Sequence, residues 1–366
     1  MKKVKLISIQ VCIWGLMIGF LSCEKNPVKQ NGELTIGAAY RGAIIVNEGH
    51  FQQGDASLSF FDSDSQQIYN DVFKDKNGES LGDVGNSIYL RDTLAYIVIN
   101  NSDKIEVINT QSFRRSRKII LPAGTSPRHL AFTDDAEILV TSLYSGKVLS
   151  IDLASGVVSG EIPVGANPEE ILRFNNQVFV ANSGFGAGNT VSVIGLPGKA
   201  VQKEIDVGDN PRFLRADPSG RIHVLCGGDY KDWGNPDDDT PGGIWVIDPG
   251  NMRVSDSLIL PVGQHPGKFD ISAEGHGYVV VDGQIRVYET QTMELLENDI
   301  TGNSALNAYA LRFNSHENLL YILDAVDFVS MGRLWILDPE NSAMTGPFET
   351  GAIPGDVAFI IEKRDQ

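Results

Sequence analysis

Polar side chains recur at one position in this sequence, the end of each short run rich in β-branched residues. Amides, hydroxyls and carboxylates gathered in this way hold a large polar ligand through many dispersed hydrogen bonds. Each Asn, Ser or Asp by itself also caps a tight turn, so the pattern is informative only as a set. The set consists of Asn47, Asn100, Ser142, Asn182, Asp282 and Asp324, followed in some units by His50, Phe51, Tyr144 and Phe185.

A second set of charged, amide and aromatic side chains stands at the start of the expected innermost strand of each unit, often beside a proline. If both sets lie on one face, they form a concave surface of mixed charge at the mouth of a central channel, which suits a small molecule or a partner protein. The dipeptide Glu169-Glu170 does not predict an acid/base pair, because adjacent residues of an extended strand point to opposite sides. The second set consists of Asn86, Arg128, His129, Glu169, Arg212, Phe213, Lys268, Tyr309 and Asp356.

One unit carries a long polar insertion, G-G-D-Y-K-D-W-G-N-P-D-D-D-T-P-G-G. Tyr230 and Trp233 within it are expected to form a stacking lip beside the binding face. The consecutive carboxylates of Asp237, Asp238 and Asp239 are hard oxygen ligands of the kind calcium prefers, although their order does not match an EF-hand loop. A solvated acidic loop explains the same residues and is the interpretation we favour, and calcium is the one cofactor that the sequence suggests.

Signatures of catalysis are absent from the sequence. The six histidines are scattered over different units without the H-x-x-x-H spacing of a zinc site, and no G-x-S-x-G motif occurs. His50 and His129 would share the binding face, which leaves a metal or proton-transfer role open. The sequence therefore favours a non-catalytic protein, with a metal-dependent hydrolase of lactonase type as a weaker alternative.

Three markers show that these residues belong to a repeated unit, and each marker occurs seven times. They are a glycine between units, a strand end before a tight turn, and the end of the β-branched run, which is polar in six units and Cys226 in the other. Alternating apolar residues favour strands over helices, and apolar residues on both faces indicate sheets that are covered on both sides. The sequence predicts an all-β, seven-bladed β-propeller, in which the glycines between units are Gly82, Gly124, Gly165, Gly208, Gly263, Gly302 and Gly351.

The two ends of the repeat are incomplete in complementary ways. Residues 354–361 match the innermost strand of a unit, whereas the first unit begins at its second strand. We therefore predict that residues 354–361 join strands from residues 42–73 in one composite blade. Closing the ring in this way removes an exposed sheet edge.

The first residues predict export and a lipid anchor. Three lysines precede an uncharged apolar run, and Phe20-Leu21-Ser22-Cys23 resembles a bacterial lipobox. We expect residues 1–22 to be a lipoprotein signal peptide, residues 23–39 a flexible tether from lipidated Cys23, and residues 40–366 the propeller. An ordinary cleaved signal peptide is the alternative.

Net charge argues against nucleic acid as a partner. The 366-residue chain has a formal net charge of −17, and loss of residues 1–22 removes three lysines and no acid, which takes the charge to −20. Affinity for nucleic acid depends mainly on Lys and Arg that displace counterions, so a chain this acidic repels phosphate backbones.

Several units resemble those of a known group of propellers. N-S-D-K-I-E-V-I-N-T, V-A-N-S-G-F-G-A-G-N-T-V-S-V-I and I-P-V-G-A-N-P are similar to YVTN-type propellers of the YncE and surface-layer group. The opening I-V-N-E-G-H-F-Q-Q-G-D-A-S-L-S-F-F-D, with L-G-D-V-G-N-S-I, resembles lipoprotein propellers of Bacteroidetes-type bacteria. Within this group the BtuG type captures cobalamin at the cell surface and delivers it to a TonB-dependent transporter. The resemblance thus implies a propeller and a partner of that kind, and it assigns no binding residue.

Together these observations favour a non-catalytic, ligand-capturing lipoprotein that is anchored to the outer membrane. A cobamide is its most concrete ligand, and a TonB-dependent transporter is the partner that the resemblance implies. A scaffold for protein interaction or adhesion that uses the same face is the alternative.

Overall fold

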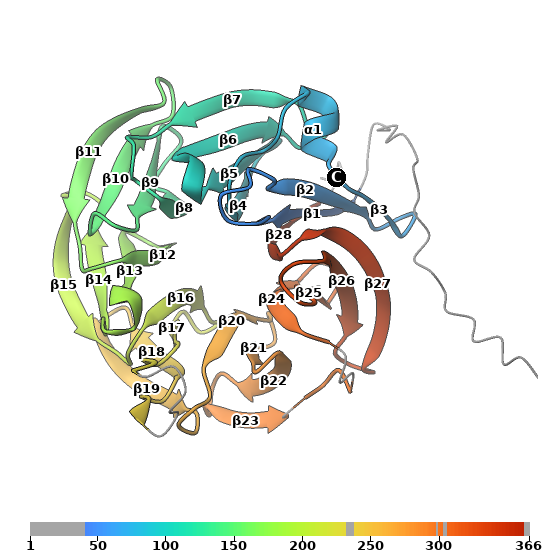
Figure 1. Ribbon diagram of the computed structural model, residues 1–366. Coiled ribbons are helices and arrows are strands. Elements are labelled where there is room, and N and C mark those ends of the chain that lie inside the picture. Colours follow the sequence, from blue (N-terminus) through green and yellow to red (C-terminus); the bar gives the residue numbers. More distant parts are fainter. Residues whose placement is uncertain (1–40, 232–237, 298, 303–305, 362–366) are drawn as a thin grey trace, which may run out of the picture.

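Seven small sheets stand in a ring around a common axis. The computed structural model describes residues 41–231, 238–297, 299–302 and 306–361, so the predicted signal peptide and tether, with Cys23, lie outside the described residues. Every sheet has four antiparallel strands, with one strand near the axis and one at the outer rim (Figure 1). The predicted all-β, seven-bladed propeller is confirmed.

The strands follow the chain blade by blade, apart from the composite blade. That blade has the order β28 (Pro354–Ile360), β1 (Gly42–Asn47), β2 (Ser57–Asp62) and β3 (Gln67–Tyr69). The next three blades contain β4 (Gly85–Arg91), β5 (Leu94–Ile99), β6 (Lys104–Asn109) and β7 (Arg115–Ile120), then β8 (Pro127–Phe132), β9 (Glu137–Ser142), β10 (Lys147–Asp152) and β11 (Val157–Pro163), then β12 (Pro168–Phe174), β13 (Gln177–Asn182), β14 (Thr190–Gly195) and β15 (Ala200–Asp206). The last three contain β16 (Pro211–Ala216), β17 (Ile222–Cys226), β18 (Gly243–Asp248) and β19 (Arg253–Ile259), then β20 (Pro266–Ile271), β21 (His276–Val281), β22 (Gln284–Glu289) and β23 (Glu294–Glu297), then β24 (Ala308–Asn314), β25 (Leu319–Asp324), β26 (Met331–Asp338) and β27 (Ala343–Ala352).

Helices are short and lie in the connections between strands. In the described part of the chain they are α1 (Val72–Asn77) and the 3-10 turns η1 (Asn100–Ser102) and η2 (Gly184–Gly186). Within the described residues, no helix has both the length and the apolar character that a membrane span requires.

The ring closes where the two ends of the chain meet. Strand β28 pairs antiparallel with β1, with Ala358 opposite Ile44 and Val357 opposite Ile45. The predicted composite blade is therefore confirmed, and the last described strand is the innermost strand of the blade that the first one begins.

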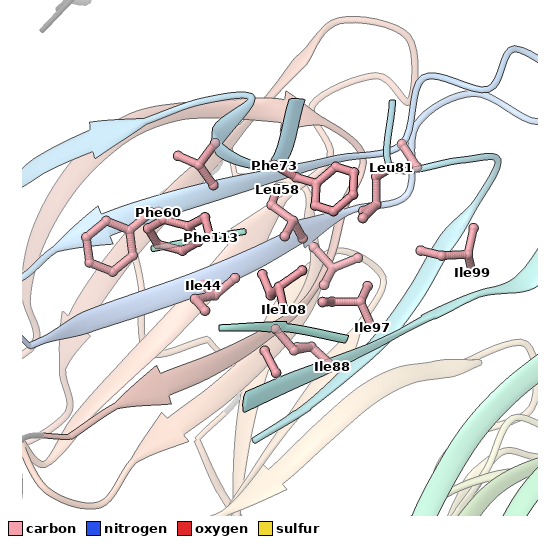
Figure 2. Packing of buried hydrophobic residues seen from close by; sticks show 14 residues of the cluster. Ile44, Leu58, Phe60, Phe73, Leu81, Ile88, Ile97, Ile99, Ile108 and Phe113 are labelled. Carbon is pink, nitrogen blue, oxygen red and sulfur yellow. The ribbon is translucent and has the colours of Figure 1, made fainter. Parts of the chain in front are cut away.

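Each blade buries both faces of its inner strands against its neighbours. All six residues of β1 are buried. Ile44 and Val46 pack with β4 to β6 of the following blade, in the cluster that Figure 2 shows, whereas Ala43 and Ile45 pack with the preceding blade. Phe73 of α1 belongs to the first cluster. Two-sided burial explains why these strands are apolar at successive positions, and it keeps the blades in register around the axis.

One face of the ring gathers two kinds of loop, those that follow the second and the fourth strand of each blade counted from the axis. In one pair of blades, Val164 of the β11–β12 loop donates its backbone N–H to the carbonyl of Gly146 in the β9–β10 loop, at 3.0 Å. Asn167 donates from Nδ2 to the Leu143 carbonyl at 3.0 Å. We call this face the upper face, and it is the one on which the sequence predicts binding.

Candidate functional site

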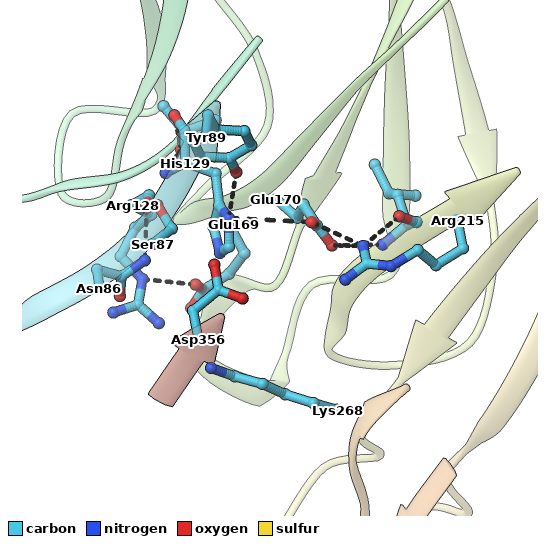
Figure 3. A network of polar contacts seen from close by, with 12 residues as sticks. Asn86, Ser87, Tyr89, Arg128, His129, Glu169, Glu170, Arg215, Lys268 and Asp356 are labelled. Carbon is cyan, nitrogen blue, oxygen red and sulfur yellow. Dashed lines mark hydrogen bonds and ion pairs between the residues drawn. The ribbon is translucent and has the colours of Figure 1, made fainter. Parts of the chain in front are cut away.

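Polar side chains from all seven blades meet at the axis. Innermost strands shift register against their neighbours near their first residues, for example between Pro168 and Ile171 and between Pro266 and Phe269. Such a bulge allows successive residues of one strand to remain near the axis and face different partners. Figure 3 shows part of the resulting network.

The layer farther from the upper face alternates acidic and basic side chains, and we call it the ion-pair ring. Arg215 donates from Nη1 to Glu170 at 2.8 Å and from Nε to Asp270 at 2.9 Å. Arg312 donates from Nε to Asp356 at 3.2 Å. These five residues come from β12, β16, β20, β24 and β28, so the ring links consecutive blades.

Each carboxylate of the ion-pair ring also accepts a backbone N–H from the neighbouring blade. A carboxylate that accepts such a bond holds both strands in place, and its charge strengthens the hydrogen bond. The ion-pair ring is therefore a structural device that joins the innermost strands. The pairs are Glu170 with Leu214 (2.8 Å), Asp270 with Phe313 (2.9 Å) and Asp356 with Ile88 (3.1 Å).

Electrostatics set the protonation of two predicted site residues, Asp356 of this ring and His129 beside it. Burial alone would raise the pKa of the Asp356 carboxyl, but Arg312 and Lys268 hold that pKa below its ordinary value. Burial and the charge of Arg128 lower the pKa of His129 well below its ordinary value. The Tyr89 hydroxyl lies 2.7 Å from Nδ1 of His129. His129 is thus a neutral, hydrogen-bonded ring at neutral pH.

A second layer lies nearer the upper face, and we call it the mouth layer. Arg128 donates from Nε to Glu169 at 2.7 Å, and the Tyr309 hydroxyl donates to Glu48 at 2.9 Å. The predicted residue Asn86 donates from Nδ2 to the Arg128 carbonyl. The members of the mouth layer are Glu48, Arg128, Glu169, Arg212, Lys268 and Tyr309.

Exposed aromatic rings stand on the upper face in five loops that follow second strands, and we call them the aromatic rim. Tyr144 and Phe185 lie with their ring centroids 5.7 Å apart. Phe328 lies 5.3 Å from Tyr309, which connects the rim to the mouth layer. The rim consists of Phe51 (64% exposed), Tyr144 (67%), Phe185 (61%), Tyr230 (40%) and Phe328 (45%).

Most of the predicted strand-end residues build turns. Asn47 and Asn182 are buried, and each donates from Nδ2 to two hydroxyls of the following strand. A Cβ at Gly351 or Gly165 would lie 2.5–2.6 Å from these side chains, which explains the glycine marker in two units. Asn100 donates to the Pro127 carbonyl, and Ser142 donates to the Thr125 carbonyl. Asp324 accepts a hydrogen bond from the backbone N–H of Val326. Asp282 is exposed and has a φ of 51°.

The insertion brings an aromatic ring, a histidine and a carboxylate together. Tyr230 stacks on His265 with ring centroids 3.6 Å apart. Nε2 of His265 lies 2.9 Å from Asp239 Oδ2, and Asp238 is exposed. Trp233 and Asp237 lie outside the described residues. Within the part of the chain that is described, no three His, Cys, Asp or Glu side chains are grouped to hold a metal, so calcium stays a prediction.

His50 joins the composite blade to the blade before it, and this contact depends on pH. Nδ1 lies 2.7 Å from Asp55 Oδ2, and Nε2 lies 3.0 Å from the Val329 carbonyl oxygen. The hydrogen bond to Asp55 and the one to Val329 raise the pKa of His50 above 6.5. Because the folded state binds this proton more tightly, the stabilisation is fully present below pH ~6.5 and is lost as pH rises through the folded-state pKa.

The variant His50→Gln should therefore lower Tm at pH 6 and have little effect at pH 9. The expected loss is small, at most about 2–4 °C, because partly exposed ion pairs contribute ~1 kcal/mol or less. Differential scanning fluorimetry across that range measures it. His316→Gln is the control, since this exposed ring has no ion pair among the described residues. An equal effect of His50→Gln at both pH values would contradict the assignment.

Several residues in or beside the two layers were missed from the sequence. They are Glu48, Tyr89, Arg215, Asp270 and Arg312. For Arg215, Asp270 and Arg312 the available signal was a charged residue within an otherwise apolar innermost strand, as in P-R-F-L-R and P-G-K-F-D. A buried charge requires a partner, so these positions were candidates for mutual pairing.

Fold and site together define a seven-bladed β-propeller with an aromatic rim around a charged centre. A family model described as a domain of unknown function, DUF5074, matches residues 41–227, which is just over half of the chain. The chain belongs to this family. A search of curated proteins finds no match.

Solved structures share the fold at low sequence identity. A protein from Lactobacillus plantarum has a TM-score of 0.65 at 12% identity, over 88% of this chain and 100% of that one. A quinonprotein alcohol dehydrogenase-like protein from Bacteroides thetaiotaomicron has a TM-score of 0.64 at 15% identity, over 87% and 78%. A functionally unknown protein from Desulfotomaculum acetoxidans has a TM-score of 0.62 at 17% identity, over 87% and 98%. At these identities the likeness concerns the fold alone.

Proposed function

We propose that this protein captures a small molecule on its upper face without chemical conversion. The observation that carries the proposal is the aromatic rim, in which Phe51, Tyr144 and Phe185 are each more than 60% exposed. Rings of this size are usually buried in a soluble chain, and exposed apolar groups gathered on one face are typical of a binding surface.

The mouth layer supplies the polar complement to this rim. Arg128, Arg212 and Lys268 offer donors, and Glu48 and Glu169 offer acceptors. Phe328 joins the two zones through Tyr309. A ligand with a flat or apolar body and polar substituents would rest its body on the rim and direct its substituents toward the axis.

We further propose that the ligand is a cobamide and that the protein is a lipid-anchored component of the cell envelope. The lipobox-like residues that end at Cys23 and the resemblance to cobalamin-capturing lipoprotein propellers support this. Cobamides are large and combine a flat macrocycle with many amides, which suits dispersed contacts on an open face. Delivery to a TonB-dependent transporter is the corresponding role.

A thermal-shift titration of the mature protein with cyanocobalamin tests the proposal. A ligand that binds only the folded state raises stability by RT ln(1 + [L]/Kd), or about 2.7 kcal/mol at 100-fold excess over Kd. Saturable stabilisation is expected. The absence of stabilisation at saturating concentration would reject cobamide capture, and a parallel series with haem and glycans extends the test to other small molecules.

Replacing two rim residues should weaken that binding. The double variant Tyr144→Ala, Phe185→Ala removes neighbouring exposed rings and should raise Kd by at least about tenfold, with Tm of the free protein unchanged. Isothermal titration calorimetry measures Kd. The control Ile120→Ala, Val157→Ala removes two exposed apolar side chains from outermost strands, and it should bind normally. Equal Kd values for both double variants would show that the rim does not bind the ligand.

A scaffold that binds another protein remains the second candidate, because one loop extends the rim with aliphatic surface. Beside Phe328, Val329 is 70% exposed and Met331 is 46% exposed. A partner protein would cover this patch, whereas a small molecule at the axis would leave it accessible. Loss of binding in the variant Val329→Ser but not in Tyr144→Ala would favour the scaffold.

A further inference from the structure

Arg212 differs from the other arginines at the axis because no carboxylate holds it. Arg128 is paired with Glu169, Arg215 with Glu170 and Asp270, and Arg312 with Asp356. Among the described residues, Arg212 has neither an ion pair nor a side-chain hydrogen bond, and its guanidinium lies 5.3 Å from the ring centroid of Phe213. An arginine in this state has five N–H donors available for a ligand.

Lys268 is a second cation without a carboxylate within ion-pair distance in the described part of the chain. Its ammonium donates to the Gly355 carbonyl and lies 5.7 Å from the Phe213 centroid and 5.3 Å from the Tyr309 centroid. Burial lowers the pKa of Lys268, and the charges of Arg128 and Arg212 lower it further, against the opposing effects of Glu48 and Asp356. A negative charge placed beside these cations would relieve their mutual repulsion.

The two cations share one aromatic ring. Both lie within 6 Å of the Phe213 centroid, and Phe213 itself is 4% exposed, so both cations are held close to one buried ring. The mouth layer as a whole holds three basic groups and two carboxylates. The ion-pair ring holds three carboxylates and two arginines, so the charges at the axis balance overall, and what the mouth layer offers a ligand is donors on Arg212 that the described residues leave unused.

We propose that Arg212 and Lys268 form a subsite for an oxyanion group of the ligand, a carboxylate or a phosphoryl group. This inference rests on the proposed capture function and specifies its ligand: a small molecule with an anionic group near the axis and an apolar body toward the aromatic rim. The planar donors of arginine match two oxygens of a carboxylate or phosphate, and lysine adds a point charge. The ligand oxyanion would accept hydrogen bonds from Arg212 donors that no carboxylate of the described residues uses.

Three small probes with the same ring and different charge test the subsite. Phenyl phosphate and benzoate are titrated into the mature protein at constant ionic strength, with benzamide as the uncharged analogue, and binding is followed by thermal shift and by ligand-observed NMR. We expect saturable binding of both anions, with a Kd for benzamide at least about fivefold higher, because hydrogen bonds between charged groups are stronger than neutral ones.

Single substitutions test whether Arg212 and Lys268 bind the anions. Arg212→Gln should raise Kd for the two anions about tenfold and leave benzamide unchanged, and Lys268→Met should act in the same direction. Arg173→Gln removes the same charge from an exposed residue near the far end of β12 and should bind like the unaltered protein. Far-UV circular dichroism and Tm establish that each variant is folded, and Arg212→Lys should retain part of the affinity.

The outcomes separate this inference from the proposed function. Two results would overturn the subsite. Either neither anion binds, or the anions bind no more tightly than benzamide in both the unaltered protein and Arg212→Gln. In either case the capture function would still stand if cyanocobalamin bound and the double variant Tyr144→Ala, Phe185→Ala weakened its binding. Anion binding that Arg173→Gln weakens as much as Arg212→Gln would also overturn the subsite, because it would show a long-range effect of net charge alone.

Discussion

A chain that ends at Ile353 should not form a stable propeller. The truncation removes β28, the innermost strand of the composite blade, and leaves the inner edge of β1 unpaired from Gly42 to Asn47, while the other edge still pairs with β2. It also removes buried Val357 and the Asp356 carboxylate that accepts from the next blade. We expect a loss of more than ~5 kcal/mol, comparable with the entire stability of many domains, and therefore no cooperative thermal transition.

A second truncation provides the control. A chain that ends at Ile361 keeps the whole of β28 and should unfold at the same temperature as the full chain. Circular dichroism and differential scanning calorimetry compare the three proteins. If the chain that ends at Ile353 kept the Tm of the other two, β28 would not close the ring.

The second large effect is expected at Glu170 of the ion-pair ring. Glu170→Ala leaves the buried N–H of Leu214 without its acceptor and removes one of the two carboxylates that hold Arg215. Breaking a buried pair by removing one partner costs about 3–5 kcal/mol, which corresponds to a decrease in Tm of about 6–20 °C.

Two further variants show whether burial of the charge is the cause. Glu170→Gln keeps an acceptor for Leu214 and should cost less than Glu170→Ala. Glu161→Ala removes a carboxylate that pairs with Lys147 at the exposed rim, and it should cost less than ~1 kcal/mol. Urea denaturation at pH 7 gives the three free energies of unfolding. Equal losses at Glu170 and Glu161 would contradict a structural role for the ion-pair ring.

The sequence was sufficient to predict the ring and its closure. Glycines between units and strand ends recur because every blade repeats the same contacts, such as Gly165 against Asn182 and Gly351 against Asn47. The complementary ends of the repeat predicted the pairing of β1 with β28, because a sheet edge left open is unfavourable.

The pairing of charges at the axis was beyond the sequence pattern. A period of two places Glu169 and Glu170 on opposite sides of a strand, but it does not show that one meets Arg128 and the other Arg215. Those contacts depend on bulges and on which blades are neighbours. For the same reason Arg215, Asp270 and Arg312 were missed, since each becomes a paired charge only after the ring is closed.

At the strand ends, the sequence pattern selected some residues that do not face a ligand. Asn47 and Asn182 follow β-branched runs in the same way as Phe51 and Phe185, yet the asparagines are buried in turns and the rings are exposed. The pattern alone does not distinguish a side chain that caps a strand from one that projects three or four residues later. The loop conformation decides, as at Phe185, which has a φ of 53°.

Hydrogen–deuterium exchange of the protein with and without saturating cyanocobalamin shows whether the upper face captures this ligand. We expect slower exchange in the upper-face loops at residues 47–56, 143–146, 183–189 and 325–330, and unchanged exchange in the loops of the opposite face at residues 133–136 and 153–156. Protection confined to the opposite face, or no protection anywhere, would contradict capture of this ligand by the aromatic rim and the mouth layer.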